Sequence, residues 1–428
     1  MRNTQMYLHP EVETMSRKDI EKLQLQRLKA TINRCMHSPF YKERFQQCGI
    51  KPEDIQSLED LQRIPFTTKQ DLRDHYPFGL SAVPLEEVVR LHSSSGTTGT
   101  PTVILHTQHD LEEWANAVAR CLYMVGLRKG DIFQNSSGYG MFTGGLGFQY
   151  GAERLGMLTV PAAAGNTKRQ IKFITDFGTT ALHAIPSYAG RLYEVMQEMH
   201  IDPRRDTHLK TLIIGAEPHS DEQRRRIENM LGVKAYNSFG MSEMCGPGVA
   251  FECPEQNGLH IWEDYYIVEI VDPVTLEPVP EGAEGEAMPL LRYRTRDLTR
   301  ILPGDCPCGR HHKRLDRMKG RSDDMIILKG VNIFPIQIEN ILLQFKELGN
   351  EYLITLTNLD ANDEMTVEVE LNDFTDDYGF LQNLTKEITR QLKDEILITP
   401  RVKLVPKGSL PVQEGKAVRV KDLRKTLI

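Results

Sequence analysis

The sequence has no run of about eighteen uninterrupted apolar residues, the length that a helix needs to cross a bilayer. It also has no excess of positive charge, because 52 Lys and Arg stand against 59 Asp and Glu, a formal net charge of −7. No basic stripe with interleaved aromatic residues is visible, so nucleic acid is not an expected partner. Met1 to Pro10 lack the apolar core of a signal peptide. We therefore expect a cytoplasmic protein that acts on small molecules, with no membrane partner.

Cysteine is scarce, and its odd number, 7 in 428 residues, argues against a disulfide framework. The segment Cys306-Pro-Cys308 pairs two thiols, and Cys253 precedes His260 by seven positions. Three sulfurs and one imidazole would complete a tetrahedral zinc site. His311 and His312 compete with His260 for the fourth place, and reduced structural thiols are an equally open alternative.

A loop rich in hydroxyls and glycine runs directly into the apolar segment Thr102 to Leu105. Gly96 and Gly99 permit turns that aim successive N–H groups at an anion, so the loop predicts polyphosphate binding. It lacks the lysine of a Walker loop, so another group must neutralise the phosphates. A solvated linker is the alternative, but linkers rarely lead straight into core strands. The candidate phosphate-binding residues are Ser93, Ser94, Ser95, Gly96, Thr97, Thr98, Gly99 and Thr100.

Strand-length apolar segments alternate with helix-length amphipathic segments between residues 102 and 238, which predicts βαβ units. The composition becomes β-rich after Trp262, and the last hundred or so residues favour an α+β module. We therefore predict an α/β protein. Its large N-terminal domain, residues 1–320, has mainly parallel β-sheets flanked by helices plus a β-rich subdomain. Its small mobile C-terminal α+β domain spans residues 321–428.

Several candidate ligand-binding residues follow predicted strands, where parallel sheets bind their ligands. Glu243 lies in such a loop and is a candidate magnesium ligand, although most glutamates are solvated surface groups. The segment Arg292 to Arg300 alternates in charge. As a strand it would present Asp297 to a sugar diol, and an exposed edge strand is the alternative.

Two further segments combine unusual residues. Tyr139 and Phe142 lie among the glycines of Gly138 to Gly147, where they could wall an apolar pocket; a glycine-rich turn with core aromatics is the alternative. Near the end of the chain, Lys416 sits at the tip of a glycine-flanked loop. An ordinary solvated lysine is the common case, but this one could supply the cation that the phosphate loop lacks.

Taken in order, five motifs resemble the core motifs of the acyl/aryl adenylate-forming enzymes: Ser93 to Pro101, Asn237 to Glu243, Tyr293 to Asp297, Gly320 to Gly330, and Lys416. The resemblance covers nearly the whole chain. Four segments are most similar to phenylacetate–coenzyme A ligases: Gly138 to Gly147, Gly165 to Thr167, Ser242 to Gly248, and Asn332 to Pro335.

The resemblance implies a role for each motif. The Ser93 to Thr100 loop would hold the β- and γ-phosphates of ATP, Glu243 would help bind magnesium, and Asp297 would bind the ribose. Lys416 would reach the carboxylate and the α-phosphate, and zinc would be structural. Residues that would contact the nucleotide are Ala216, Glu217, Pro218, Tyr236, Asn237, Ser238, Phe239, Gly240, Met241, Ser242 and Arg321. Tyr139, Phe142, Gly145 and Gly147 would shape the acid pocket, and Asp323 would lie at the hinge.

The implied activity is that of an ATP-dependent, AMP-forming acid–thiol ligase of phenylacetate catabolism. Phenylacetate or a close aryl acetate would form an acyl-AMP with release of pyrophosphate, and coenzyme A would capture the acyl group. The small domain would rotate about residues 320–324 between the two steps, and the enzyme would be a homodimer. Alternatives are another aryl acid, such as indoleacetate or a benzoate, and a nucleotide-binding regulator without ligase activity. The segment Gly285 to Pro289 departs from the family pattern, because a strand and a loop are shortened or missing near Glu286–Ala287.

Overall fold

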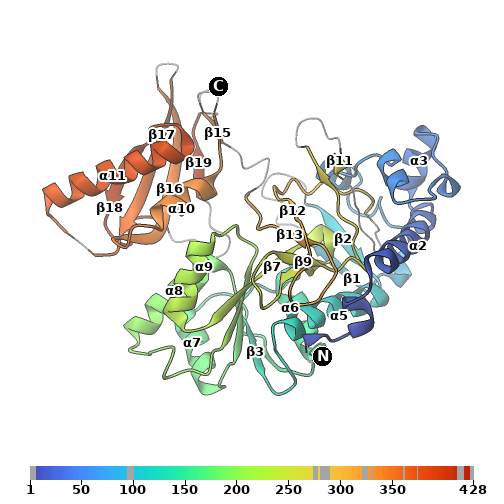
Figure 1. Cartoon of the computed structure of the whole chain (residues 1–428), viewed down its shortest axis with the longest axis horizontal. Helices are drawn as coiled ribbons and strands as arrows, with labels where there is room; N and C mark the ends of the chain where they lie inside the picture. Colours follow the sequence, from blue (N-terminus) through green and yellow to red (C-terminus); the bar gives the residue numbers. More distant parts are fainter. Residues whose placement is uncertain are drawn as a thin grey trace. The chain divides into compact units, whose positions relative to one another are not determined.

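The computed structural model describes residues 6–93, 101–272, 278–279, 290–320, 326–328, 331–359, 362–373, 375–411 and 419–424. The chain forms two compact units (Figure 1). The first unit consists of Met1–Ala184, Thr207–Gly215 and Tyr236–Arg317, and the second of Ile185–Asp206, Ala216–Ala235 and Met318–Ile428. The last change of unit lies close to the predicted boundary at residue 320. The division into domains of residues 1–320 and 321–428 stays a prediction, since the second unit also includes two earlier segments.

The amino-terminal segment forms three helices: α1 (Pro10–Glu13), α2 (Arg17–Cys35) and α3 (Pro39–Gln47). Helix α4 (Lys69–Asp74) begins at a capping box, in which Thr68 accepts from Asp71 N. Short 3₁₀ turns lie at Pro52–Asp54, Glu59–Arg63 and Leu85–Glu87. The apolar faces of α2 and α3 join one buried cluster with strand β2 (Val103–His106), which pairs antiparallel with β1 (Arg90–Ser93). These helices therefore support the strands on both sides of the predicted phosphate loop.

A nine-stranded sheet forms the centre of the first unit, in the order β12-β13-β9-β8-β7-β6-β5-β3-β4. Strand β3 is parallel to β4 and β5, and β5 is parallel to β6, as the strand–helix alternation predicts. The half from β7 to β12 is antiparallel, which the sequence did not reveal. The strands are β3 (Ile132–Asn135), β4 (Leu158–Val160), β5 (Ala181–Ala184), β6 (Thr211–Gly215), β7 (Lys234–Met241), β8 (Gly246–Glu252), β9 (Leu259–Ile261), β12 (Ile301–Leu302) and β13 (Arg314–Leu315).

Helices of the same unit cover this sheet: α5 (Gln108–Met124), α6 (Thr143–Arg154) and α7 (Thr167–Asp176). Helices α5 and α6 pack on each other and on β8 (Figure 1). Part of the glycine-rich segment Gly138 to Gly147 is thus the first turns of α6, rather than a turn alone. Two short strands, β10 (Ile270–Val271) and β11 (Pro278–Val279), pair separately.

The predicted strand at Arg292 to Arg300 is wrong. Arg292 has a left-handed φ of 50° and Arg296 one of 66°, which no regular strand contains. The Arg292 guanidinium is buried, pairs with Glu269 at 2.7 Å and stacks over the Phe66 ring. Arg292, the first arginine of the segment, is therefore part of a buried ion pair and does not belong to an exposed edge strand.

The second unit contains a four-stranded sheet in the order β18-β17-β16-β19, with a core continuous with α10 and α11. Its carboxyl-terminal helices and strands match the predicted α+β module. Their bounds are β14 (Ile326–Leu328), β15 (Val331–Ile333), α10 (Pro335–Leu342), β16 (Leu348–Leu359), β17 (Asn362–Leu371), α11 (Tyr378–Ile396), β18 (Arg401–Val405) and β19 (Val420–Asp422). The unit also includes α8 (Pro186–Glu198) and α9 (Asp221–Leu231).

Candidate functional site

Part of the predicted site lies outside the described residues. This applies to Ser94, Ser95, Gly96, Thr97, Thr98, Gly99, Thr100, Arg321, Asp323 and Lys416, and also to the shortened segment at Glu286–Ala287. The described part of the site consists of the residues that flank the loop and of the strand ends beside it.

The two ends of the phosphate loop lie side by side, because Ser93 pairs with Val103 at the open end of the β1–β2 hairpin. The N–H of Ser93 donates to the carbonyl oxygen of Met141 at 3.0 Å, and His92 Nδ1 lies 3.0 Å from the same oxygen. These contacts join Ser93, the loop's first residue, and the preceding His92 to the segment that carries Tyr139 and Phe142. The predicted phosphate and acid sites are thus neighbours in the fold.

Glu243 lies at the exit of this loop. It sits in a short 3₁₀ turn, Ser242–Met244, directly after β7, and it is buried. Thr102 Oγ1 donates to Glu243 Oε1 at 3.4 Å, and Lys69 Nζ lies 3.3 Å from the same oxygen. A carboxylate and a hydroxyl beside a phosphate loop are oxygen ligands of the kind that magnesium prefers. No sequence pattern indicated that Thr102 and Lys69 contact Glu243, because both lie far from it in the chain.

Aromatic side chains fix the turn that follows Glu243. Trp114 Nε1 donates to the carbonyl oxygen of Pro247 at 2.8 Å, and the Tyr266 hydroxyl donates to that of Met244 at 3.2 Å. Between them Cys245 and Gly246 adopt left-handed φ values of 65° and 98°. The backbone of the turn that follows Glu243 is thus held on both sides.

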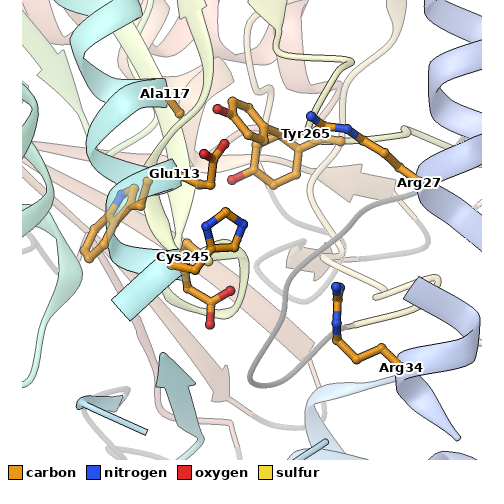
Figure 2. Close-up of a pocket in the computed structure, with 10 residues that line it drawn as sticks. Arg27, Arg34, Glu113, Ala117, Cys245 and Tyr265 are labelled. Carbon is orange, nitrogen blue, oxygen red and sulfur yellow. The ribbon is translucent and has the colours of Figure 1, made fainter. Parts of the chain in front are cut away.

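A cavity of about 270 Å³ lies behind this turn (Figure 2). Its walls include Arg27 and Arg34 from α2, Glu113 and Ala117 from α5, and Cys245 and Tyr265. No residue of the predicted nucleotide or acid site lines it. Its role in the site is indirect, because two of its aromatic wall residues, Trp114 and Tyr266, anchor the turn.

The glycines predicted to shape the acid pocket are explained by packing. A Cβ on Gly147 would lie 2.4 Å from Trp114 Cζ2 and 2.7 Å from Pro247 Cγ. A Cβ on Gly145 would lie 2.5 Å from the carbonyl oxygen of Gly138. Glycine at 147 thus lets α6 approach α5 and β8, whereas glycine at 145 lets it approach the loop at Gly138. Their direct contact with an acid stays a prediction.

We expect Gly147→Ala to displace Trp114 or Pro247 and to destabilise the protein by about 1–3 kcal/mol, the usual cost of overpacking. Gly144→Ala on the same helix is the matched control, because a Cβ there meets nothing within 4 Å. Alanine favours a helix over glycine by up to about 1 kcal/mol, so the control should be neutral or more stable. Denaturant unfolding of both variants measures the difference. Equal stability of the two would contradict this account of the packing.

A neutral polar cluster lies at the carboxyl ends of β3 and β5. His183 Nδ1 is 3.0 Å from both Asn135 Oδ1 and Ser137 Oγ. Burial lowers the pKa of His183 to about 3, so the imidazole is uncharged at neutral pH. Asn135 Nδ2 also donates to the hydroxyl of half-buried Tyr139 at 3.4 Å, and desolvation raises the pKa of that phenol to about 12. Strand-end position was the one sequence signal that could have identified Asn135 and His183.

Phe142 is half exposed and immediately precedes α6, whereas Tyr139 is half buried. Neither lines the cavity of Figure 2. Their contact with an aryl acid therefore stays a prediction.

The predicted nucleotide-contacting residues also lie at strand ends. Gly215, at the end of β6, approaches β7 so closely that an added Cβ would lie 2.4 Å from the carbonyl oxygen of Ser238. The next residue, Ala216, has a left-handed φ of 66°, which is unusual for a residue with a side chain. On β7, Asn237 N donates to the buried carboxylate of Glu252 at 2.8 Å. In the second unit, Glu217 accepts hydrogen bonds from Ser187.

The remaining predicted residues extend along the same strand and the following loop. Tyr236, Asn237 and Ser238 are buried in β7, whereas Phe239, Gly240, Met241 and Ser242 are partly exposed. Asp297 is half buried, and its N–H donates to Thr295 Oγ1 at 3.2 Å. Pro218 follows Glu217 in the loop before α9.

Four predicted zinc ligands meet in a buried cluster. The ligating atoms of Cys253, His260, Cys306 and Cys308 all lie within 4.8 Å of one another. Cys253 Sγ is 3.7 Å from Cys306 Sγ, and Cys308 Sγ is 3.3 Å from His260 Nε2. A tetrahedral ion with Zn–S bonds of 2.3 Å needs sulfur–sulfur distances of about 3.8 Å. The donor set and its spacing therefore fit zinc.

The competing histidines point elsewhere. His311 Nδ1 lies 3.2 Å from the carbonyl oxygen of Met15, and His312 Nδ1 accepts from Glu263 N at 3.0 Å. His260 is thus the imidazole that completes the cluster.

Comparisons with known proteins agree with this arrangement. Residues 40–289 match the AMP-binding enzyme family, and residues 330–424 match the AMP-binding enzyme C-terminal domain. The chain is 46% identical to a phenylacetate-coenzyme A ligase of Pseudomonas putida, over 96% of each chain. The chain belongs to the phenylacetate–coenzyme A ligase family of AMP-binding enzymes. It is also 42% identical to the ligase of that name from Escherichia coli K12, over 96% of this chain and 97% of the relative.

The structure of 2-hydroxyisobutyryl-CoA ligase in the postadenylation state, in complex with 2-HIB-AMP, is similar to this ligase with a TM-score of 0.91 and 30% identity. The similarity covers 99% of this chain and 94% of that one. The predicted α/β fold with a large and a small domain is thereby confirmed, as is the prediction of an AMP-forming acid–thiol ligase with ATP and coenzyme A as substrates. Among the described helices of this ligase, none has the length and apolar character required to cross a bilayer.

Proposed function

We propose that this ligase activates phenylacetate or a close aryl acetate. The main support for an adenylation site is that Glu243 lies beside Thr102, at the exit of the predicted phosphate loop. The names of the relatives support the choice of acid, since they are phenylacetate-coenzyme A ligases at 42–46% identity over nearly the whole chain.

In the first step a carboxylate oxygen of the acid attacks the α-phosphorus of ATP, and the bond to pyrophosphate breaks. Glu243 helps hold magnesium, the 93–100 loop holds the leaving pyrophosphate, and Lys416 stabilises charge at the α-phosphate. Asp297 binds the ribose, and Arg321 contacts the nucleotide. Charge stabilisation is the main requirement of this step, so no general base is needed.

In the second step the sulfur of coenzyme A attacks the acyl carbon, AMP leaves, and the thiol proton passes to solvent. Lys416 is needed only for adenylation. The small domain, residues 321–428, therefore rotates about the hinge at Asp323 between the steps.

Tyr139 and Phe142 contact the aryl group in this proposal. The contacts of Ser93 and His92 with Met141 support it, because they hold the aromatic segment beside the phosphate loop.

The proposal also includes the finer properties that the family resemblance implies. Magnesium accompanies ATP, and zinc occupies the Cys253, His260, Cys306 and Cys308 cluster as a structural ion. The protein is a cytoplasmic homodimer. Elemental analysis and size-exclusion chromatography with light scattering measure the zinc content and the oligomeric state.

Acid-dependent ATP–pyrophosphate exchange over a panel of carboxylic acids tests the function. We expect the highest exchange with phenylacetate. Coenzyme A consumption should rank the acids in the same order as the exchange does. A preference for indoleacetate or a benzoate would change the acid but keep the ligase. Exchange without coenzyme A consumption would point to another acceptor, and no exchange with any acid would favour a nucleotide-binding regulator.

A further inference from the structure

The turn that carries two of the cysteines also holds the beginning of the chain. The Tyr7 hydroxyl donates to the carbonyl oxygen of Cys308 at 2.6 Å. Gly309 has a left-handed φ of 82°, and a Cβ there would lie 2.6 Å from the same hydroxyl. Residues 6–17, called the amino-terminal clamp below, therefore contact the cysteine turn directly.

Arg310 connects the clamp to the cluster. Its guanidinium is fully buried and donates to Glu13 Oε2 from Nε at 3.0 Å and from NH2 at 2.6 Å. Its NH1 group also lies 3.7 Å from Cys308 Sγ. One arginine thus bonds both a candidate zinc ligand and a carboxylate of the clamp.

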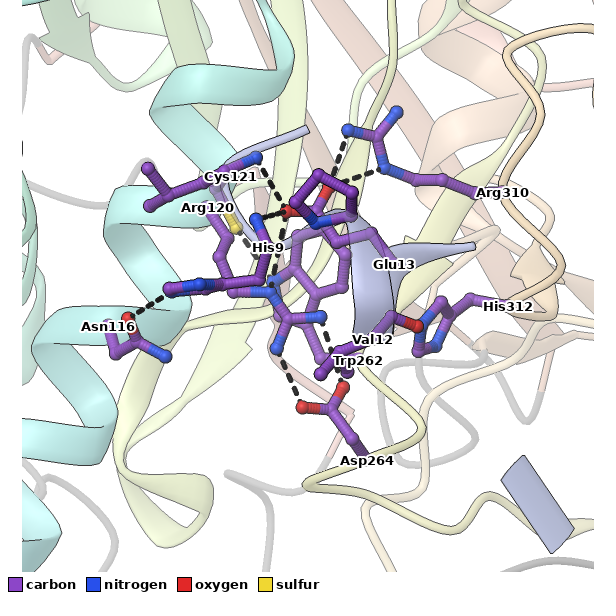
Figure 3. A network of polar contacts seen from close by, with 12 residues as sticks. His9, Val12, Glu13, Asn116, Arg120, Cys121, Trp262, Asp264, Arg310 and His312 are labelled. Carbon is purple, nitrogen blue, oxygen red and sulfur yellow. Dashed lines mark hydrogen bonds and ion pairs between the residues drawn. The ribbon is translucent and has the colours of Figure 1, made fainter. Parts of the chain in front are cut away.

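Glu13 is the centre of a buried charge network (Figure 3). Its side chain is wholly inaccessible, and its Oε1 accepts from Leu8 N and His9 N at 2.9 and 3.0 Å. Arg120 Nε lies 3.9 Å from the same oxygen. A buried carboxylate that loses its cation is costly, so the position of Arg310 decides whether the clamp can stay folded over it.

A second set of contacts runs in parallel. His312 Nε2 lies 3.1 Å from the carbonyl oxygen of Val12, while Arg17 pairs with Glu263 at 2.6 Å. Glu263 in turn accepts from Lys313 N at 2.6 Å. The segment after the cysteine turn therefore holds the clamp at Val12 directly and at Arg17 through Glu263.

The network continues toward the segment beside the active site. Arg120 donates to both carboxylate oxygens of Asp264, at 2.7 and 3.1 Å. Two residues later, the Tyr266 hydroxyl bonds the carbonyl oxygen of Met244, next to Glu243. The clamp thus lies at one end of a continuous series of contacts that reaches the predicted magnesium ligand.

We propose that zinc at the four-ligand cluster fastens the amino-terminal clamp, by fixing the cysteine turn and with it Arg310. The inference rests on the zinc site included in the proposed function. His260 Nδ1 lies 3.2 Å from the carbonyl oxygen of His312, which orients Nε2 toward the cysteine sulfurs, 3.3 Å from Cys308 Sγ, where a metal would bind. The same contact joins a ligand to the segment that holds Val12. Since linkage is reciprocal, a docked clamp also strengthens zinc binding.

Hydrogen exchange of the full-length protein, with zinc and after its removal by a chelator, tests the proposal. Removal should speed exchange at Leu8 and His9 by about tenfold or more, as expected when a segment undocks locally, and should leave α11 of the second unit unchanged. Restoring zinc should restore the protection. Equal protection with and without zinc would overturn the clamp, and a protein that binds no zinc would overturn it together with the metal site.

Two variants distinguish a specific loss of the coupling between clamp and zinc from a general loss of stability. Arg310→Gln keeps all four ligands, yet we expect zinc affinity to fall about 10–100-fold, the usual effect of losing a group that supports a ligand. Arg300→Gln is the control, because Arg300 is exposed and pairs only on the surface with Asp316. Unchanged zinc affinity in Arg310→Gln would count against the coupling. Phenylacetate-dependent exchange of the untreated protein is measured in parallel, so failure of the proposed substrate is distinguished from failure of the clamp.

Discussion

Replacement of Lys416 by alanine is expected to abolish formation of the acyl-adenylate while sparing the second half-reaction. The phosphate loop contains no lysine, so Lys416 is the cation proposed to meet the α-phosphate as negative charge develops there. Loss of one such group costs about 10²–10³-fold in rate. Acid-dependent ATP–pyrophosphate exchange measures the first step, and thioester formation from supplied phenylacetyl-adenylate measures the second.

Lys407→Ala is the control for this experiment, since Lys407 is an exposed lysine that precedes the same loop. It should leave both steps within about twofold, as for most surface substitutions. Equal loss of both half-reactions in Lys416→Ala would remove the assignment of Lys416 to adenylation. It would also remove the main reason to expect the small domain to rotate between the steps.

Glu243→Gln is expected to reduce adenylation about 10²–10³-fold, comparable to the loss of another charge-stabilising group. The amide keeps the size of the side chain and can still accept from Thr102, so the fold should be preserved. It loses the negative charge that attracts magnesium. The apparent magnesium requirement should therefore rise, and titration of free magnesium in the exchange assay measures it.

Glu112→Gln on the exposed face of α5 serves as the matched control, since it makes the same chemical change away from the loop. Its magnesium titration should coincide with that of the unaltered enzyme. If Glu243→Gln lost activity without any change in the magnesium requirement, Glu243 would have a role in holding the turn rather than the metal. The contact with Lys69 at 3.3 Å would then be the interaction to investigate.

Secondary structure could be predicted where it depends on residues that are close together in the sequence. The strand–helix alternation between residues 102 and 238 correctly gave the parallel half of the sheet. The cap of α4 is also local, because Thr68 accepts from the N–H of Asp71, three residues further along the chain. The neighbouring Thr67 contacts the hydroxyl of Tyr41 from α3 in the core, a contact across 26 positions of sequence that no local pattern reveals.

Long-range contacts explain what the sequence did not reveal. Alternating charge at Arg292 suggested a strand, but burial against Glu269 and Phe66 took precedence over that local preference. Likewise, nothing near Glu13 in sequence indicates that it is buried, because its partners are Arg310 and Arg120. The gathering of Cys253, His260, Cys306 and Cys308 could be predicted because cysteine is rare enough for its spacing to be informative.

The close packing of Gly147 has a consequence for altering which acids the enzyme accepts. A side chain at this position meets Trp114 and Pro247, which also anchor the turn of Glu243. If Glu243 holds magnesium as proposed, substitutions at Gly147 would disturb the metal as well as the proposed acid pocket. If Phe142 contacts the aryl group as proposed, this half-exposed residue outside that packing is a position where substrate range could diversify without loss of the common adenylation chemistry.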